Sequence, residues 1–404
     1  MVLRMAWRNI WRNKMRSLVI MFSIATGLLA GIAVLSLYDA MMNSRVRTVI
    51  DSEVAHIQLH HTNFKKDYDP KYVIANGDDV LQAIKKMPQV KAATARSITT
   101  GMLATATGSA GVTINGIIPE EEYKVSQLKQ KLTAGKLFDE NKKSQVMIGK
   151  KLAVKMKLKP GSKLVLTFTD TSGAIVSAAF RVAAIYESAN APLDERNVYV
   201  RMNELNELLL SNASFHEIAV LLSKDETLKT VQQNMQQLFP SVLVESWKDI
   251  SPETDLMVDT VDQYSYIIMI IIMLALAFGI INTMLMAILE RTREIGMMMA
   301  LGTNRSKLFI LVLCETLLLT LAGTPIGVLM GWLLTAYFHT KGLDLSGWGK
   351  EMMSNFGFGT MIYPEFPAER LPAVLLIVTA TALVSCLFPA VKALKLQPVE
   401  ALRR

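Results

Sequence analysis

Few side chains in this sequence have a type and spacing suited to catalysis or metal binding. His56 and His60 stand four residues apart, which is a metal-ligand spacing on a helix. The alternating pattern of residues 53–61 predicts a strand, however, and on a strand the two imidazoles would lie roughly 13 Å apart. Cys314 and Cys386 both fall within apolar runs. We therefore expect no metal site and no disulfide framework.

Motifs for nucleotide chemistry and hydrolysis are also missing. The sequence contains no G-x-x-x-x-G-K-[ST] loop, which would cradle the phosphates of ATP, and no H-E-x-x-H, C-x-x-C or G-x-S-x-G motif. We therefore expect a non-catalytic chain with no cofactor of its own. The net charge of +8 would suit a nucleic-acid-binding protein. The basic residues cluster at the ends of apolar runs, however, where they orient a membrane protein, so nucleic acid is excluded as a partner.

One carboxylate, Glu315, interrupts the apolar run from Leu308 to Phe338. A carboxylate in hydrocarbon costs on the order of 3 kcal/mol, so we expect this group to face protein or a water-filled cavity. Two interpretations remain open. Glu315 is either a polar contact between helices, which we favour, or a functional group that acts as a pivot or as a contact near an ATPase partner.

A charged, methionine-rich island, Glu290–Arg305, separates two long apolar runs. Its apolar residues recur at offsets of three and four, which predicts one stripe of a short helix. The stripe consists of Ile295, Met298, Met299 and Leu301, and Gly302 would end the helix. Because the opposite face is charged, we expect the stripe to lie along the membrane surface or against a partner. The alternative is an ordinary polar loop between two spans.

Four apolar runs are long enough to cross a membrane, since about 20 residues suffice. The predicted spans are residues 18–38, 264–289, 308–338 and 371–391. The flanking cations place residues 290–307, the tail 392–404 and an amphipathic interfacial helix at 1–17 in the cytoplasm, and residues 39–263 and the loop 339–370 outside. We therefore expect a multi-pass protein of the inner membrane, with an uncleaved first span and both termini in the cytoplasm.

Two rows of glycine, four residues apart, predict helix-packing faces. The rows are Gly27 and Gly31 in the first span, and Gly323, Gly327 and Gly331 in the third. Glycine lets helix backbones approach closely, so these faces should be seams between helices of one chain or between two copies. The alternative is that glycine is simply common in membrane helices.

The outer segment is long enough to form a core of its own. A strand–helix–strand pattern occurs at about 50–110 and again at about 215–247, and the two units bracket a β-rich stretch at about 111–212. We expect strands at 53–61, 90–107, 163–168, 180–186, 217–222 and 242–245, and helices at 78–87 and 226–238. The predicted fold class is a membrane α-helical protein with four transmembrane helices and a large extracytoplasmic α+β domain.

The island resembles the cytoplasmic coupling segment of ABC permeases related to MacB, FtsX and the lipoprotein-releasing LolC and LolE subunits. The family motif is E-R-x-x-E-I-G-x-x-x-A-[IL]-G, and the matching residues are Glu290, Arg291, Glu294, Ile295, Gly296, Ala300, Leu301 and Gly302. The end of the chain is similar to the P-x-E-A-L-R ending of the same permeases, at Pro398, Glu400, Ala401, Leu402 and Arg403. Residues 148–164 also resemble the two-lobed periplasmic domain of this family, so the resemblance covers the whole chain.

The resemblance implies that the island couples the chain to a separate ABC ATPase dimer, which would bind ATP and Mg. Arg293, Met298, Met299 and Arg305 would take part in this coupling beside the motif residues. Further partners implied are a second permease copy or a paralogue, membrane lipids, and a lipoprotein substrate or a periplasmic adaptor. The length of the chain favours lipoprotein release of the LolC and LolE type, although the aromatic loop 339–370 differs from that type. The alternatives are MacB-like efflux of peptides or amphiphiles, and a non-transporting mechanotransmitter that activates a cell-wall enzyme.

Overall fold

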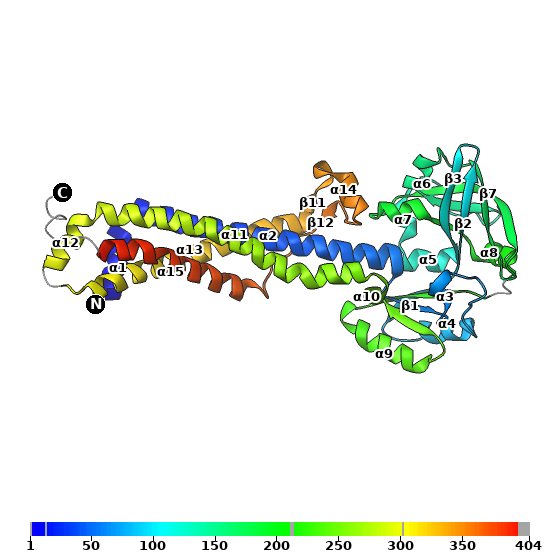
Figure 1. Cartoon of the computed structure of the whole chain (residues 1–404), viewed down its shortest axis with the longest axis horizontal. Coiled ribbons are helices and arrows are strands. Elements are labelled where there is room, and N and C mark those ends of the chain that lie inside the picture. Colours follow the sequence, from blue (N-terminus) through cyan, green and yellow to red (C-terminus); the bar gives the residue numbers. More distant parts are fainter. Residues whose placement is uncertain (1, 13, 211–213, 301–302, 395–404) are drawn as a thin grey trace. The chain divides into compact units, whose positions relative to one another are not determined.

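The computed structural model describes residues 2–12, 14–210, 214–300 and 303–394 of the 404-residue chain. The chain divides into two compact units (Figure 1). The first, which we call the helical unit, comprises Met1–Met42, Asp259–Leu343 and Met361–Arg404. The second, which we call the sheet domain, comprises Asn43–Val258 and Asp344–Thr360.

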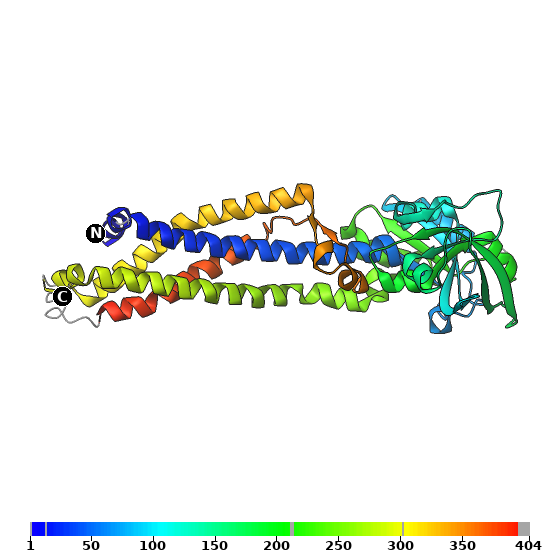
Figure 2. The same ribbon diagram turned by 90° about the horizontal axis from the view of Figure 1, so that it is seen from above.

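Four long helices carry apolar stretches that are long enough to cross a membrane by length and composition. They are α2 (Lys14–Thr48), α11 (Pro252–Glu290), α13 (Arg305–Lys341) and α15 (Leu371–Leu394). Two shorter helices, α1 (Val2–Arg12) and α12 (Thr292–Ala300), complete the helical unit. Figures 1 and 2 show the long helices running alongside one another. Helices α2 and α11 extend well beyond the predicted apolar runs, because adding a residue to an existing helix costs little.

The glycines of the third span lie against the first span of the same chain. A Cβ atom on Gly323 would lie 2.8 Å from the carbonyl oxygen of Met21, and one on Gly327 would lie 2.9 Å from that of Ala25. Gly331 approaches the side chain of Ile32 just as closely. The α13 helix therefore touches the backbone of α2, which only glycine permits.

The glycine row of the first span faces a different helix. A Cβ atom on Gly27 would lie 3.1 Å from the side chain of Leu276, and one on Gly31 would lie 3.3 Å from the sulfur of Met269. Both of those neighbours belong to α11. The α2 helix therefore has one glycine-lined seam with α11 and presents a second face to the glycines of α13.

The sheet domain is built on one ten-stranded sheet in the order β10-β1-β9-β2-β3-β8-β5-β7-β4, with β6 paired to β2 and β7. The strands are β1 (Ile57–His60), β2 (Val90–Thr105), β3 (Gly108–Ile117), β4 (Leu132–Gly135), β5 (Gln145–Gly149), β6 (Lys163–Thr169), β7 (Ile175–Tyr186), β8 (Asn197–Arg201), β9 (Glu217–Leu222) and β10 (Leu243–Ser246). The helices are α3 (Phe64–Asp67), α4 (Gly77–Lys85), α5 (Pro119–Val125), α6 (Lys150–Lys155), α7 (Ala191–Arg196), α8 (Met202–Leu209), α9 (Leu228–Leu238), α10 (Trp247–Ile250) and α14 (Lys350–Asn355). A short ladder of β11 (Leu343–Asp344) and β12 (Met361–Ile362) flanks the segment that contains α14.

The first and last strand–helix–strand segments form one lobe of this sheet. Strand β1 pairs antiparallel with β9 and with β10, so that Ile57 lies opposite Val220 and Ser246. Helices α4 and α9 pack their apolar faces on this lobe through Leu81, Ile84, Val231 and Met235. The helices predicted at 78–87 and 226–238 are confirmed. The strand predicted at 53–61 is shorter than expected, because residues 49–54 form a π-helix.

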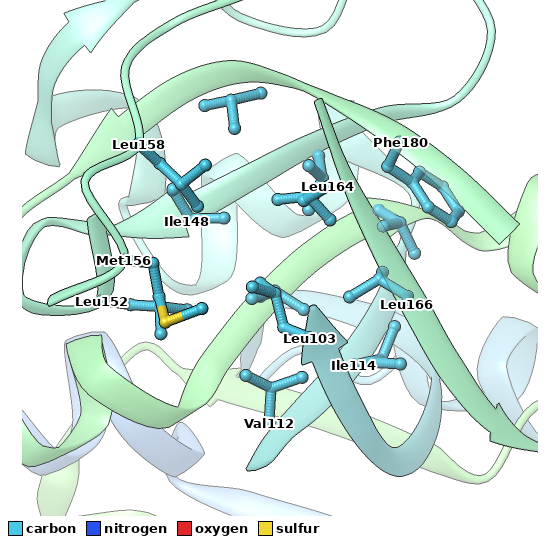
Figure 3. Packing of buried hydrophobic residues seen from close by; sticks show 14 of the residues in the cluster. Leu103, Val112, Ile114, Ile148, Leu152, Met156, Leu158, Leu164, Leu166 and Phe180 are labelled. Atoms are coloured by element: carbon cyan, nitrogen blue, oxygen red, sulfur yellow. The ribbon is translucent and has the colours of Figure 1, made fainter. Parts of the chain in front are cut away.

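The β-rich middle of the chain forms the second lobe, with its own core on strands β2, β3 and β5 to β8 (Figure 3). Leu152 and Met156, at α6, and Leu205 of α8 close this core. Strand β2 pairs with β9 along its first half and with β3 and β6 along its second half. The sequence predicts a boundary near residue 111, between the first outer unit and the β-rich stretch. This position lies inside β3, because the two lobes share strands of a single sheet.

A buried network of charges crosses the first lobe. The guanidinium of Arg96 donates hydrogen bonds of 2.7 and 2.8 Å to Glu122 and one of 2.8 Å to Glu217. Glu217 also pairs with Nε2 of His60 at 3.1 Å, and Nδ1 of His60 lies 3.6 Å from Glu245. These contacts join β1, β2, β9, β10 and α5. The imidazole of His60, which the sequence predicts to be unsuited to metal binding, is an ion-pair partner in this network.

The network shifts the pKa values of its members. Burial opposes the charge on His60, but its pairing with Glu217 and Glu245 raises the pKa of His60 above 6.5. Burial would raise the pKa of Glu217, but His60 and Arg96 lower it to about 2. Pairing with His60 and Lys65 likewise lowers the pKa of Glu245 to about 2. Tyr68 and Lys65 of the α3 region face the same cluster.

The shift of His60 predicts that this residue contributes most to stability in mildly acidic solution. The stabilisation from His60 is present below pH 6.5 and is lost as the pH rises through its raised folded pKa. The carboxylates stabilise above pH 4.5 and lose their contribution as the pH falls toward 2. The His60→Gln variant should therefore lower the midpoint of thermal unfolding, followed by circular dichroism, more at about pH 5.5 than at about pH 8.5. The His61→Gln variant, at a half-buried neighbour, should show no such pH-dependent loss.

The glycine seam gives a second prediction. Gly327→Ala should destabilise the helical unit by about 1–3 kcal/mol, because its Cβ would collide with the backbone of Ala25. Gly279→Ala is the matched control, since nothing lies within 4 Å of a Cβ at that position. The control should be neutral or slightly stabilising. Equal unfolding midpoints for the two variants in detergent would contradict a close α2–α13 seam.

Candidate functional site

The island predicted to couple the chain to a partner forms the separate helix α12. Helix α11 ends at Glu290, where the hydroxyl of Thr292 donates a 2.6 Å hydrogen bond to the carbonyl of Leu289. Helix α12 then begins at Thr292 and ends at Ala300. Because the hydroxyl of Thr292 bonds a carbonyl that has no partner within the helix at the end of α11, the chain can change direction between the two helices.

The apolar face of α12 is packed inside the chain. Ile295 is buried and lies in a cluster with Ala6 of α1, Ile288 of α11, and Leu308 and Leu311 of α13. Met298 and Met299 pack against the same cluster. The expectation that this stripe lies on the membrane surface or docks a partner is therefore corrected, because the amphipathic α1 and the start of α13 already cover it.

Arg291 connects three helices at the base of the island. Its Nη1 donates to the two carboxylate oxygens of Glu315 at 3.3 and 3.4 Å, and its Nη2 donates to the carbonyl of Asn9 at 3.3 Å. Its Nε lies 3.9 Å from the carboxylate of Glu294. Both Arg291 and Glu315 are buried, with 9% and 8% of their surface exposed. Glu315 therefore makes a polar contact between α13 and the start of the island, and Arg291 is not exposed.

The exposed residues of the segment form its outer face. Among the described residues they are Glu290, Arg293, Glu294, Met297, Ala300, Asn304 and Arg305. The buried residues of the segment are Arg291, Ile295 and Gly296, which face the interior of the helical unit. Leu301 and Gly302 lie outside the described residues. So does the C-terminal motif from Pro398 to Arg403, while Leu394 at the end of α15 packs on the cluster around Ile295.

Sequence reasoning missed three participants. Met297 is 54% exposed, but it lies off the apolar stripe that the sequence predicts as the binding face. Arg12 forms an ion pair with Glu294, and Asn9 accepts the bond from Arg291. The cations of α1 are visible in the sequence, but only the fold shows that this helix contacts α12. Helices α1, α11, α12 and α13 together line a cavity of about 290 Å³.

Two protein-family models match this chain. The MacB-like periplasmic core domain matches residues 17–238, which is more than half of the chain, and the FtsX-like permease C-terminal matches residues 266–398. The second match includes α12 and its supports on α11 and α13. The chain belongs to the MacB-like and FtsX-like permease family. It is a permease with four apolar helices able to span a membrane and a large α+β domain.

Curated relatives of the permease include the macrolide export ATP-binding/permease protein MacB of Escherichia coli O6:K15:H31 (strain 536 / UPEC), which is 25% identical over 413 residues. The alignment covers 100% of this chain and 60% of that relative. MacB of Photorhabdus laumondii subsp. laumondii is 26% identical over 413 residues, with 99% and 60% covered. The permease therefore spans less than two thirds of the length of these relatives.

Solved structures resemble the permease only weakly. The periplasmic region of MacB from Actinobacillus actinomycetemcomitans covers 52% of this chain and 95% of its own, with 14% identity and a TM-score of 0.37. The extracellular domain of the noncanonic ABC-type transporter YknZ from Gram-positive bacteria covers 47% and 99%, with 16% identity and a TM-score of 0.34.

The Arg291–Glu315 pair gives a third prediction. Arg291→Met should destabilise the helical unit by about 3–5 kcal/mol, because it leaves a buried carboxylate without its cation. The double variant Arg291→Met with Glu315→Met should regain most of this loss, since two apolar groups leave no buried charge. Arg12→Met is the control, because its pair with Glu294 is half-exposed and contributes at most about 1 kcal/mol. The unfolding midpoints of all three variants are measured in detergent. A wild-type midpoint for Arg291→Met would contradict a stabilising role of the Arg291–Glu315 pair.

Proposed function

We propose that this permease is the membrane subunit of an ABC system, in which ATP hydrolysis by a partner ATPase moves α12 and so drives work in the sheet domain. The observation that carries the proposal is the construction of α12. One face is fixed to α1, α11 and α13 by Ile295 and Arg291, while the charged face and Met297 remain exposed. A force on the exposed face would thus reach the spans through packed side chains.

The charge distribution supports an orientation for this mechanism. Cations precede the first apolar run at Arg4, Arg8 and Arg12, and flank the island at Arg293 and Arg305. By the positive-inside rule, α1, α12 and both termini lie in the cytoplasm of an inner membrane, and the sheet domain lies outside. The island then has access to a cytoplasmic ATPase.

The ATPase itself is proposed as a dimer of separate chains that bind ATP and Mg. The relatives carry the name ATP-binding/permease protein, and this chain spans 60% of their length, so an ATP-binding component is expected to work with the permease. A second permease copy or a paralogue would complete the assembly, with membrane lipids around the spans. The family and the exposed outer face of α12 support these partners.

The substrate class is proposed from the character of the spans. The apolar runs 18–38, 264–289, 308–338 and 371–391 within α2, α11, α13 and α15 carry no charged side chain for a hydrophilic solute, apart from Glu315. An amphiphilic or lipid-anchored substrate therefore suits them better. The name of the relatives supports efflux, and the resemblance to LolC and LolE supports lipoprotein release. A mechanotransmitter acting on a cell-wall enzyme would use the same motion without a substrate.

A fourth prediction tests the coupling face. Arg293→Glu and Met297→Glu should each weaken association with the ATPase about five- to ten-fold and reduce its stimulation, because both side chains are exposed on α12. Lys341→Glu, at the last residue of α13, is the control and should leave association unchanged. Affinity purification with the natural neighbours and ATPase assays in nanodiscs measure both quantities. Recovery of no ATPase with the wild-type chain would refute the central claim.

The same preparation separates the substrate classes. Reconstituted with its ATPase, the permease would release a lipoprotein from the bilayer, move a macrolide-like amphiphile to an adaptor, or do neither. Release identifies the LolC and LolE type, and transport identifies efflux. If ATP drives only a conformational change in the sheet domain, the transmitter is the correct function.

A further inference from the structure

The segment between the third and fourth spans belongs to the sheet domain. Residues 344–360 cluster with this domain, whereas the residues on either side belong to the helical unit. The amide of Leu345 donates a 2.8 Å hydrogen bond to the carbonyl of Thr360, which closes the segment into a loop. We call residues 344–360 the strap.

Polar contacts hold the strap on the domain. Lys350 of α14 lies 3.3 Å from the carboxylate of Glu187, which also pairs with Lys150 at 2.7 Å. Lys151 of α6 donates a 3.0 Å hydrogen bond to the side chain of Asn355. These lysines are about half-exposed, so their contacts are screened by water and each contributes little to holding the strap.

Apolar packing does not hold α14 in place. Helix α14 has no buried residue, and Met352 is 67% exposed. Phe356, which follows the helix, is 57% exposed. Where α14 faces α6 and α7, a cavity of about 560 Å³ separates them. The polar contacts of Lys350 and Asn355, at the edge of this cavity, therefore hold the strap over it.

One close approach fixes the end of the strap. Gly357 adopts a φ of +73°, and a Cβ at this position would lie 2.7 Å from the guanidinium of Arg45. Arg45 is itself held by Glu53 at 2.6 Å, and Glu53 accepts a 2.6 Å hydrogen bond from Asn190, next to α7. The far end of the strap therefore rests on a more buried ion pair than α14 does.

We propose that the strap is a reversible clasp over the cavity of α6 and α7, with α14 released when its rim contacts break and Gly357 acting as the fixed end. The cavity lining carries four lysines and four carboxylates, so its charges cancel and favour no ligand charge. The clasp controls access to this cavity, and its opening would carry the already exposed Met352 and Phe356 away from α6 and α7. Because the strap is continuous with α13 and the segment before α15, movement of those helices would pull on it.

The test measures the position of the strap directly and does not involve an ATPase. Spin labels are placed at Met352→Cys and at Asn141→Cys in the full chain, with Cys314 and Cys386 replaced by alanine. Double electron–electron resonance in nanodiscs then reports the distance between the strap and the domain. At low salt we expect one main distance. A rise to about 0.5 M salt should increase a second, longer distance about three- to five-fold, because salt screens the rim ion pairs.

The variant Lys350→Gln should produce the same second distance at low salt, while leaving the pair between Lys150 and Glu187 intact. Lys155→Gln is the matched control, because its pair with Glu195 lines the same cavity without touching the strap. A distance that responds to neither salt nor Lys350→Gln would overturn the proposal, since the strap would then be fixed. A broad distribution already present at low salt would also overturn it, because the strap would never dock.

Discussion

The structure around α12 depends on the need to neutralise a carboxylate within an apolar helix. Glu315 could not remain in the third span without a partner, because an isolated charge in hydrocarbon is costly. Arg291 supplies that partner and also holds the carbonyl of Asn9, so one guanidinium joins α1, α12 and α13. The same pairing removes Arg291 from the outer face. A change in the position of α12 is therefore communicated to α13 at a point where separation of the helices is expensive.

Close backbone contact gives the helical unit its rigidity. The glycines of α13 rest against backbone and β-carbon atoms of α2, and those of α2 rest against Leu276 and Met269 of α11. Such contacts leave little room for sliding, because added atoms would overlap at once. The pair of helices α2 and α13 should thus move as one body when α12 is displaced.

The sheet domain combines a rigid frame with a loosely held element. Strand β2 takes part in both lobes, and the network of Arg96, Glu217, His60 and Glu245 ties four strands together in the interior. The strap with α14 is held by exposed polar contacts and has no buried side chain in its helix. Buried charge pairs are costly to break, whereas exposed ones exchange easily with water. The domain therefore places its weak contacts where the chain returns from the spans.

The sequence alone determined the four spans, the helices α4 and α9, most strands of the sheet and the family. These features depend on local periodicity or on a linear motif, which survive in one dimension. The tertiary structure decided which face of α12 is free. Ile295 and Met298 follow the pattern of a binding stripe, yet α1, nearly three hundred residues away in the sequence, covers them, and Met297 is exposed instead. Likewise, no local pattern shows that Glu315 meets Arg291 or that α14 belongs to the sheet domain, because long-range contacts depend on how the helices pack.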